Sequence, residues 1–180
     1  MKIAAWNIRG LNDKCKQTEI RKVIFDNQLA LLCIVETKVR RSNIDKVRRN
    51  CMPNWGLLHN TPGSGVGRVW IIWDVVRLDV ALLKNNKQSI DCMVTVRDNG
   101  KHFVLSGVYG LNDRVGRYDL WRDLRSTYAV INGLPWLIMG DFNIVRKQEE
   151  RKGGNPVDSA EMEDFNDCIQ DIQVQDMVSK

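Results

Sequence analysis

The chain has 180 residues, of which 43% are hydrophobic and 27% are charged, and its formal net charge is +5. These values are typical of one globular domain and argue against a disordered chain, and no apolar run is long enough to predict a transmembrane helix. Five widely spaced cysteines without a C-x-x-C pair, and only two histidines, argue against a structural zinc site and a disulfide framework. We therefore expect an intracellular protein of a reducing compartment, nucleus or cytoplasm, with no targeting signal and no membrane partner.

The first part of the chain predicts a βαβ unit. A strand is expected over Lys2–Asn7, an amphipathic helix over Lys14–Gln28, and a buried strand over Leu29–Val35, whose apolar run is continuous. A basic helix is expected over Ser42–Cys51, ending before Pro53. The cluster from Lys38 to Arg49 in and before this helix is either a solvated surface or a phosphate-binding surface.

The middle of the chain predicts antiparallel sheet. Asp98-Asn99-Gly100 is a strong hairpin signal between two strands, and the turn Lys84-Asn85-Asn86-Lys87 separates two others. We expect strands over Trp55–Leu58, Arg68–Trp73, Val75–Leu83, Ser89–Arg97 and His102–Tyr109.

The remainder alternates helix, strand and helix. We expect a helix over Arg114–Asn132, then a short buried strand over Trp136–Gly140. One face of this helix carries Tyr118, Trp121, Leu124, Tyr128 and Ile131. A charged loop, Arg146–Pro156, precedes a last helix over Ser159–Ile172. The pattern indicates an α/β fold in which two mixed β-sheets pack face to face and are flanked by helices, and nothing in residues 1–180 marks a second domain.

Polar residues end the strands that we expect to be buried. They are Asn7, Glu36, Tyr109 and the pair Asp141 and Asn143. Each alone has an ordinary explanation, such as an Asx turn for Asp141 and Asn143. If the strand ends converge, the set supplies oxygen ligands and hydrogen-bond donors around one point, and hard oxygen ligands suit Mg²⁺ or Mn²⁺ better than zinc.

Four stretches, taken in order and at their intervals, resemble the endonuclease/exonuclease/phosphatase superfamily, which has a DNase I-like fold. They look most like the apurinic-type endonuclease domain of plant LINE retrotransposons, as do Gly67–Asp74 and Glu149–Gly154. The four stretches are Trp6-Asn7-Ile8-Arg9-Gly10-Leu11-Asn12, Val35-Glu36-Thr37-Lys38, Gly107-Val108-Tyr109-Gly110 and Gly140-Asp141-Phe142-Asn143.

The resemblance implies a role for each matching residue. Glu36 would be the principal metal ligand, with Asn7 beside it, and Tyr109 would donate a hydrogen bond to the scissile phosphate. Asp141 would orient or deprotonate the attacking water, and Asn143 would stabilise charge on the phosphoryl oxygens. Nucleic acid would contact four basic residues near the first two strand ends, Arg9, Lys38, Arg40 and Arg41.

The resemblance also implies a four-layer sandwich of which this chain lacks the last strands. Family members carry a late Asp-His pair that has no match here, and both His59 and His102 are expected to be surface or rim residues. We therefore expect a single domain that is incomplete at its C-terminus.

Three functions remain open at this stage. The first is a Mg²⁺-dependent endonuclease acting on DNA and derived from a retrotransposon. The second is a catalytically inactive remnant that at most binds nucleic acid, and the third is a phosphoesterase for small molecules or lipid headgroups on the same scaffold.

Overall fold

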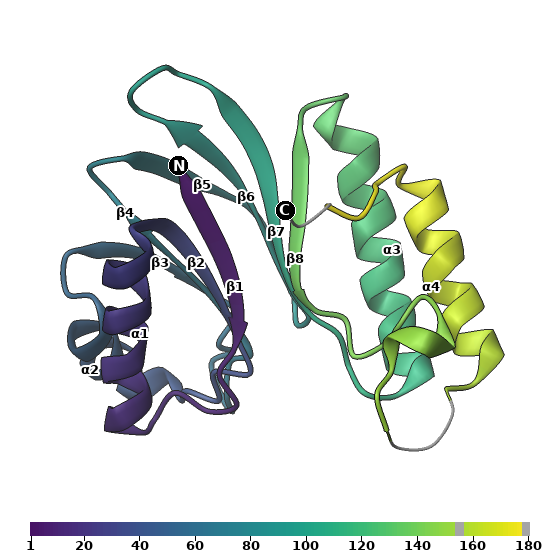
Figure 1. The fold of residues 1–180 in the computed structure, drawn as a ribbon, viewed down its shortest axis with the longest axis horizontal. Helices are drawn as coiled ribbons and strands as arrows, with labels where there is room; N and C mark the ends of the chain where they lie inside the picture. Colours follow the sequence, from purple (N-terminus) through teal and green to yellow (C-terminus); the bar gives the residue numbers. More distant parts are fainter. Residues whose placement is uncertain (154–156, 178–180) are drawn as a thin grey trace. The chain divides into compact units, whose positions relative to one another are not determined.

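The computed structural model describes residues 1–153 and 157–177, which divide into two compact units. The first, the β-sandwich unit, contains Met1–Tyr109 and Pro135–Asp141. The second, the helical unit, contains the described part of Gly110–Leu134 and Phe142–Lys180. Figure 1 shows the elements of each unit. No helix in the described ranges is both long and apolar enough to cross a bilayer.

The first sheet of the β-sandwich unit has the strand order β1-β2-β4-β3. β1 (Lys2–Asn7) lies parallel to β2 (Leu29–Val35), and α1 (Lys14–Asn27) connects them, as the βαβ pattern predicts. Every residue of β2 is buried because both faces of the strand are covered, which explains its continuous apolar run. β4 (Val69–Asp74) pairs antiparallel with β2 and with β3 (Trp55–His59).

One face of this sheet is covered by α1 and by α2 (Ile44–Cys51), which follows a 3₁₀ turn over Arg41–Asn43. Ile20 and Ile24 of α1 and Val47 of α2 are buried against Leu32 and Ile34 of β2. The basic residues of α2 lie on its outer face, since the apolar side packs on the sheet.

The second sheet has the order β5-β6-β7-β8. Its strands are β5 (Leu78–Asn85), β6 (Ser89–Val96), β7 (His102–Tyr109) and β8 (Trp136–Asp141). The predicted hairpin joins β6 to β7, and Gly100 takes the positive φ of +68° that the turn requires. β8 runs parallel to β7, so the sheet is mixed like the first.

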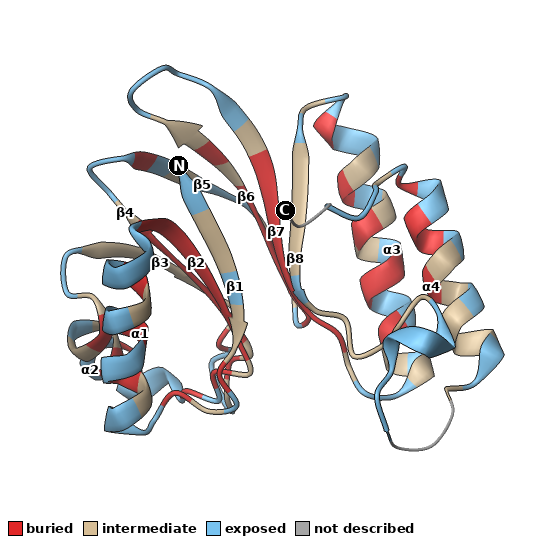
Figure 2. Ribbon diagram, in the orientation of Figure 1, coloured by how far each residue is buried: buried red, intermediate tan, exposed pale blue. Residues whose placement is uncertain are grey.

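The two sheets of this unit pack face to face. Cys33 and Ile71 from the first sheet and Cys92 and Leu105 from the second are fully buried in one core (Figure 2). The sheets approach closely at Gly107, where an added Cβ would lie 2.8 Å from Cys33 Sγ. The predicted α/β fold class with two mixed sheets is confirmed.

The helical unit is built on α3 (Arg114–Ile131) and α4 (Ser159–Asp171). Trp121 stacks on Phe165 with their ring centroids 5.2 Å apart, and Phe142 contacts both rings. Tyr118 and Trp121 line the same groove, so they share one face of α3 as predicted; Tyr118 is 44% exposed, whereas Arg117, the preceding residue, is buried. The Arg117 guanidinium is satisfied there by the carbonyl oxygens of Leu111 and Asn112.

Two predicted ends fall partly outside the described residues. The loop expected over Arg146–Pro156 contains a 3₁₀ turn at Gln148–Glu150, and its positions 154–156 lie outside the described range. Positions 178–180, for which no strand is predicted, also lie outside it. The prediction of one domain over residues 1–180 stays a prediction.

Candidate functional site

Two hydrogen bonds join the sheets of the β-sandwich unit at the carboxyl ends of four strands. The Tyr109 hydroxyl donates to Glu36 Oε1 over 2.8 Å, and Asn7 Nδ2 donates to Asp141 Oδ2 over 2.7 Å. The pairs are neighbours, because Asn7 lies opposite Val35 in the first sheet and Tyr109 lies opposite Asp141 in the second. The structure therefore brings Asn7, Glu36, Tyr109 and Asp141 together in one cluster, the strand-end cluster.

Glu36 leaves β2 in a conformation that L-residues avoid. Its φ is +57° and that of Lys38 is +53°, and neither is glycine. Left-handed backbone costs about 1–2 kcal/mol per such residue, and it persists where surrounding contacts enforce it. Here the buried Thr37 supplies those contacts, since its N–H donates to Arg68 O over 3.2 Å and its hydroxyl donates to Gly67 O over 3.1 Å. Strain of this kind concentrates at functional sites.

Gly140 sets the position of Asp141. Its φ is +137°, and an added Cβ would lie 2.0 Å from the carbonyl oxygen of Val108, so only glycine fits. A glycine inside a strand often marks a point where another backbone approaches closely. The end of β8 is thereby held against β7, with Asp141 beside Tyr109.

The segment after β1 is tied to the same cluster. Asn7 Oδ1 accepts a hydrogen bond from the Arg9 N–H over 3.2 Å. Lys16 Nζ donates to the carbonyl oxygens of Ile8 and Arg9, over 2.7 and 2.9 Å. Asn12 Nδ2 donates to Lys38 O over 2.9 Å, which links the segments that follow β1 and β2. These contacts fix the Asn7 amide with its nitrogen toward Asp141.

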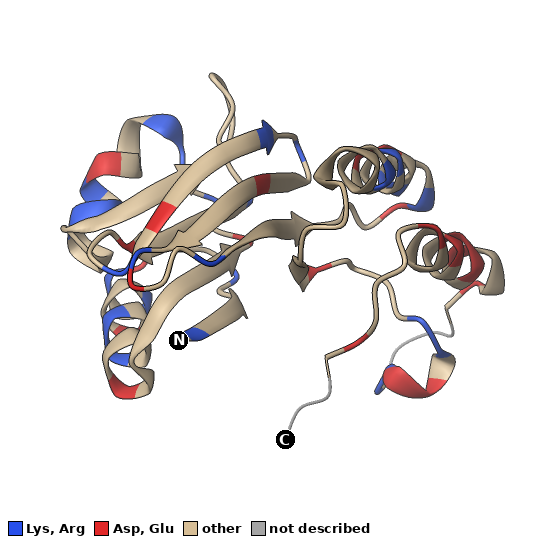
Figure 3. Cartoon of the chain, turned by 90° about the horizontal axis from the view of Figure 1, so that it is seen from above, with Lys and Arg blue, Asp and Glu red and all other residues tan. Residues whose placement is uncertain are grey.

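Two positive side chains lie beside the strand-end cluster. Lys38 Nζ lies 3.7 Å from Glu36 Oε2, and the guanidinium of Arg68 lies over the Tyr109 ring, with Cζ 5.4 Å from the ring centroid. Arg9, Arg40 and Arg41 are exposed, as a role in nucleic-acid binding requires. Figure 3 shows Lys and Arg on the helices of the β-sandwich unit and Asp and Glu along α4.

The residues of the strand-end cluster suit a hard divalent cation. The carboxylates of Glu36 and Asp141 and the amide oxygen of Asn7 are the donor types that Mg²⁺ and Mn²⁺ prefer. No group of three His, Cys, Asp or Glu residues with metal-binding geometry occurs in residues 1–153 and 157–177. One or two carboxylates completed by water and substrate phosphate are the usual protein contribution to a Mg²⁺ site.

Neither histidine belongs to the cluster. His102 is exposed at the start of β7, the opposite end from Tyr109. His59 is half-buried, and burial together with the nearby Arg41 lowers the pKa of its imidazole below the usual value. Its Nδ1 lies 3.3 Å from the donating N–H of Thr61.

Asn143 belongs to the helical unit. Its side chain donates to Gly110 O over 2.6 Å, and its φ is +53°. Arg117 Nη1 donates to its carbonyl oxygen over 3.4 Å and also to Leu111 O over 2.8 Å, so one buried cation joins the segments that follow Tyr109 and Asp141 in the chain. The role predicted for Asn143 stays a prediction.

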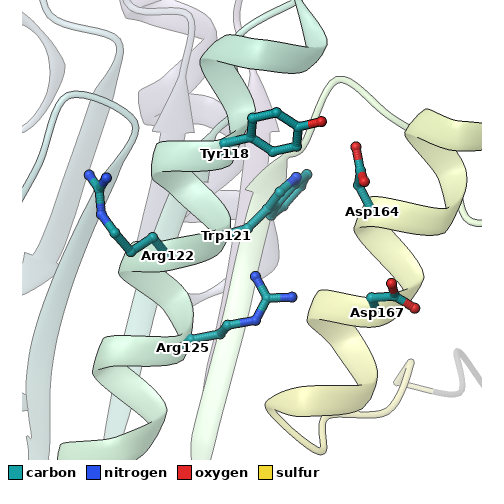
Figure 4. Close-up of a pocket in the computed structure, with 6 residues that line it drawn as sticks. All are labelled: Tyr118, Trp121, Arg122, Arg125, Asp164 and Asp167. Atoms are coloured by element: carbon teal, nitrogen blue, oxygen red, sulfur yellow. The ribbon is translucent and has the colours of Figure 1, made fainter.

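A groove lies between α3 and α4 in the helical unit, with a volume of about 440 Å³. Trp121 points into it, and its charged residues belong to both helices (Figure 4). Three of these charged side chains are already paired within the unit: Asp164 with Arg114, Arg125 with Asp171, and Arg122 with Asp119. The hydrogen bond from Arg114 holds the pKa of the Asp164 carboxyl below its usual value.

The sequence matches no protein-family model and no curated protein. Solved structures do match the fold. The AP endonuclease LMAP from Leishmania major has a TM-score of 0.71 at 14% identity, over 93% of this chain and 65% of its own. The endonuclease domain of TRAS1, a telomere-specific non-LTR retrotransposon, has a TM-score of 0.73 at 13% identity, over 93% and 70%. The catalytic domain of Xenopus laevis APE2 has a TM-score of 0.69 at 16% identity, over 92% and 67%.

These likenesses show that the chain has the DNase I-like fold of the endonuclease/exonuclease/phosphatase superfamily. The predicted resemblance is confirmed at the level of the fold. The chain spans 65% of the length of the Leishmania enzyme.

Two features of the structure near the strand-end cluster have no signal in the sequence. Arg68 belongs to a stretch that looks like LINE sequence, but its stacking on Tyr109 joins residues far apart in the chain. The second feature is Lys16, which donates hydrogen bonds to the carbonyl oxygens of Ile8 and Arg9. Hydrophobic periodicity does not reveal these bonds, because a lysine near the start of an amphipathic helix has the pattern of a solvated residue.

Proposed function

We propose that the protein is a divalent-metal-dependent phosphodiesterase of endonuclease type that acts on DNA. The observation that carries the proposal is the pair of hydrogen bonds, Tyr109 to Glu36 and Asn7 to Asp141, that gathers four polar residues at adjacent strand ends. The names of the solved neighbours, which include AP endonucleases and a retrotransposon endonuclease, support DNA as substrate and a retrotransposon origin.

Hydrolysis of a phosphodiester needs a water molecule to attack phosphorus while one P–O ester bond breaks. The water loses a proton and the departing oxygen gains one, so an alcohol and a phosphomonoester result. Asp141 is the base that accepts the proton, and Asn7 orients its carboxylate through the 2.7 Å hydrogen bond. The Tyr109 hydroxyl, which donates to Glu36 in the free protein, would turn to donate its one hydrogen bond to a phosphoryl oxygen of the substrate, and Asn143 is proposed to stabilise the same developing charge.

Glu36 and Asn7 are the residues proposed to hold Mg²⁺ or Mn²⁺, and the bound cation would supply positive charge to the phosphate and to the departing oxygen. The Lys38 ammonium 3.7 Å from Glu36 Oε2 then serves a second purpose. It neutralises Glu36 in the free protein and, with Glu36 holding a cation, would be free to contact the substrate backbone together with Arg9, Arg40 and Arg41.

Nicking of supercoiled plasmid with Mg²⁺ tests the proposal. Wild-type protein should convert supercoiled to open circular plasmid, and chelation with EDTA should stop the reaction. Glu36→Gln and Asp141→Asn should each reduce the rate by roughly 10²–10⁴-fold, the size of effect seen when an acid-base group is removed.

Asp79→Asn is the matched control, because Asp79 lies on β5 with its side chain 70% exposed and pairs with Arg97 instead of a cluster residue. It should nick at the wild-type rate. Nicking that persists in both cluster variants would reject the assignment. Salt-sensitive DNA binding without any nicking would instead identify an inactive nucleic-acid-binding remnant.

A further inference from the structure

The backbone of Arg68 is fixed on both sides. Asn60 Oδ1 accepts from the N–H groups of Arg68 and Val69, over 2.9 and 2.8 Å, and the Arg68 carbonyl accepts from the Thr37 N–H. Asn60 is itself held, because its Nδ2 donates to the carbonyl oxygens of Asn86 and Lys87. The start of β4 is thus locked against the segment that carries Glu36.

The side chain of Arg68 lies over the Tyr109 ring, where the guanidinium gains cation–π attraction. Within residues 1–153 and 157–177 it makes no ion pair and no side-chain hydrogen bond. This is unusual for a half-buried arginine, since guanidinium groups normally find a carboxylate or carbonyl oxygen. The five donors of Arg68 are therefore available to an anion at the rim of the strand-end cluster.

The other cations near the cluster differ from Arg68. Lys38 is paired with Glu36, and Arg9, Arg40 and Arg41 are exposed. An exposed side chain loses rotamer entropy when it binds, whereas Arg68 is already stacked and loses less.

We propose that Arg68 binds a second phosphate of the substrate, next to the scissile one, and so makes the site prefer a polynucleotide to a small phosphodiester. The inference rests on the proposed function, because Tyr109 marks the place of the scissile phosphate. The guanidinium lies over the ring, with Cζ 5.4 Å from its centroid, and the hydroxyl of the same ring donates to Glu36. The guanidinium therefore reaches an anion beside the scissile group, and its planar fork matches two oxygens of one phosphate.

Two substrates separate this role from a role in the chemical step. One is a short fluorescent DNA duplex, and the other is bis(p-nitrophenyl) phosphate, which has a single phosphate. Arg68→Gln should raise KM for the duplex and weaken its binding by roughly ten-fold, as expected for loss of one charge-assisted contact. The slope of log affinity against log salt should become shallower by about 1. Turnover of bis(p-nitrophenyl) phosphate should not change.

Two further variants serve as controls. Lys101→Gln removes one exposed positive charge just before β7, at the end opposite Tyr109, and should leave binding and salt slope as in the wild type. Arg68→Lys keeps the charge but loses the planar fork, so it should retain the salt slope and bind less tightly than the wild type.

The outcomes distinguish this inference from the proposed function. Unchanged duplex binding in Arg68→Gln would overturn the inference, and so would an equal loss on both substrates, which would place Arg68 at the scissile group. Protein that hydrolyses neither substrate would refute the proposed function, while the salt slopes of wild type and Arg68→Gln would still decide whether Arg68 contacts a phosphate.

Discussion

Exchanging Asn7 and Asp141 separates the pairing of these residues from their chemistry. Asn7→Asp places two carboxylates at the 2.7 Å contact, and the new side chain still accepts from the Arg9 N–H, so the damage is confined to the pair. Asp141→Asn leaves a neutral acceptor for the Asn7 amide. The double variant Asn7→Asp with Asp141→Asn restores an amide-to-carboxylate hydrogen bond in the reverse direction.

The magnitudes follow from the partly buried, charge-assisted bond. A hydrogen bond to a charged group contributes about 1.5–3 kcal/mol, so Asn7→Asp, which also adds repulsion, should cost about 3 kcal/mol. Asp141→Asn should lower the free energy of unfolding by about 1 kcal/mol, because the charge-assisted hydrogen bond is replaced by a weaker neutral one. The double variant should unfold within about 1 kcal/mol of wild type, which makes the two changes strongly non-additive.

Urea denaturation and plasmid nicking are the two assays. Stability should recover in the double variant, but nicking should stay lost, because the carboxylate would then sit at position 7 and not at the position proposed for the base. Additive destabilisation would show that the two side chains are not paired. Recovered nicking would show that the position of the carboxylate does not matter, which would refute the role of Asp141.

Three other predictions concern stability and the thiols. In urea denaturation, Arg117→Met should lower the free energy of unfolding by about 3–5 kcal/mol, because loss of the buried cation leaves Glu161 unpaired. The control Arg122→Met changes a side chain that is 72% exposed and should cost less than about 1 kcal/mol. Equal losses would contradict the role of Arg117. Burial raises the pKa of Cys33 and Cys92 to about 12. A thiol reagent at about pH 8 should therefore label the exposed Cys15 in the folded protein and all five cysteines in urea. Rapid labelling of Cys33 in the folded protein would show that this core is open. The folded Cys33 thiol keeps its proton up to about pH 12, whereas the unfolded thiol loses it near pH 9.0, so its contribution to stability is full below pH 9.0 and is lost as the pH rises toward 12. Cys33→Val should flatten this part of the curve of stability against pH, and an unchanged slope would refute the assignment.

Much of the β-sandwich unit is predictable because its signals are local. The apolar run Leu29–Val35 and the turn Asp98-Asn99-Gly100 specify a buried strand and a hairpin without reference to distant residues. The strand-end positions of Asn7, Glu36 and Tyr109 follow from the same boundaries. Their convergence, however, depends on how the two sheets pack, which only the whole fold determines.

The unpredicted features come from contacts between residues far apart in the chain. The left-handed backbone of Glu36 is enforced by Thr37 and its partners at positions 67 and 68, and a sequence pattern would reserve such a conformation for glycine. The burial of Arg117 also has no signal in the sequence, because hydropathy treats arginine as a solvated residue. Arg117 is buried because the carbonyl oxygens of Leu111 and Asn112 accept hydrogen bonds from its guanidinium, and a hydropathy scale does not include such partners.

Direct measurement of cation binding tests the central claim that the strand ends form one metal-binding site. Electron paramagnetic resonance would count the Mn²⁺ ions bound to the wild-type protein, to Glu36→Gln and to the matched surface variant Asp79→Asn. The account predicts one bound ion in the wild type and in Asp79→Asn, and a strong loss of affinity in Glu36→Gln. Equal Mn²⁺ binding by all three proteins would contradict it.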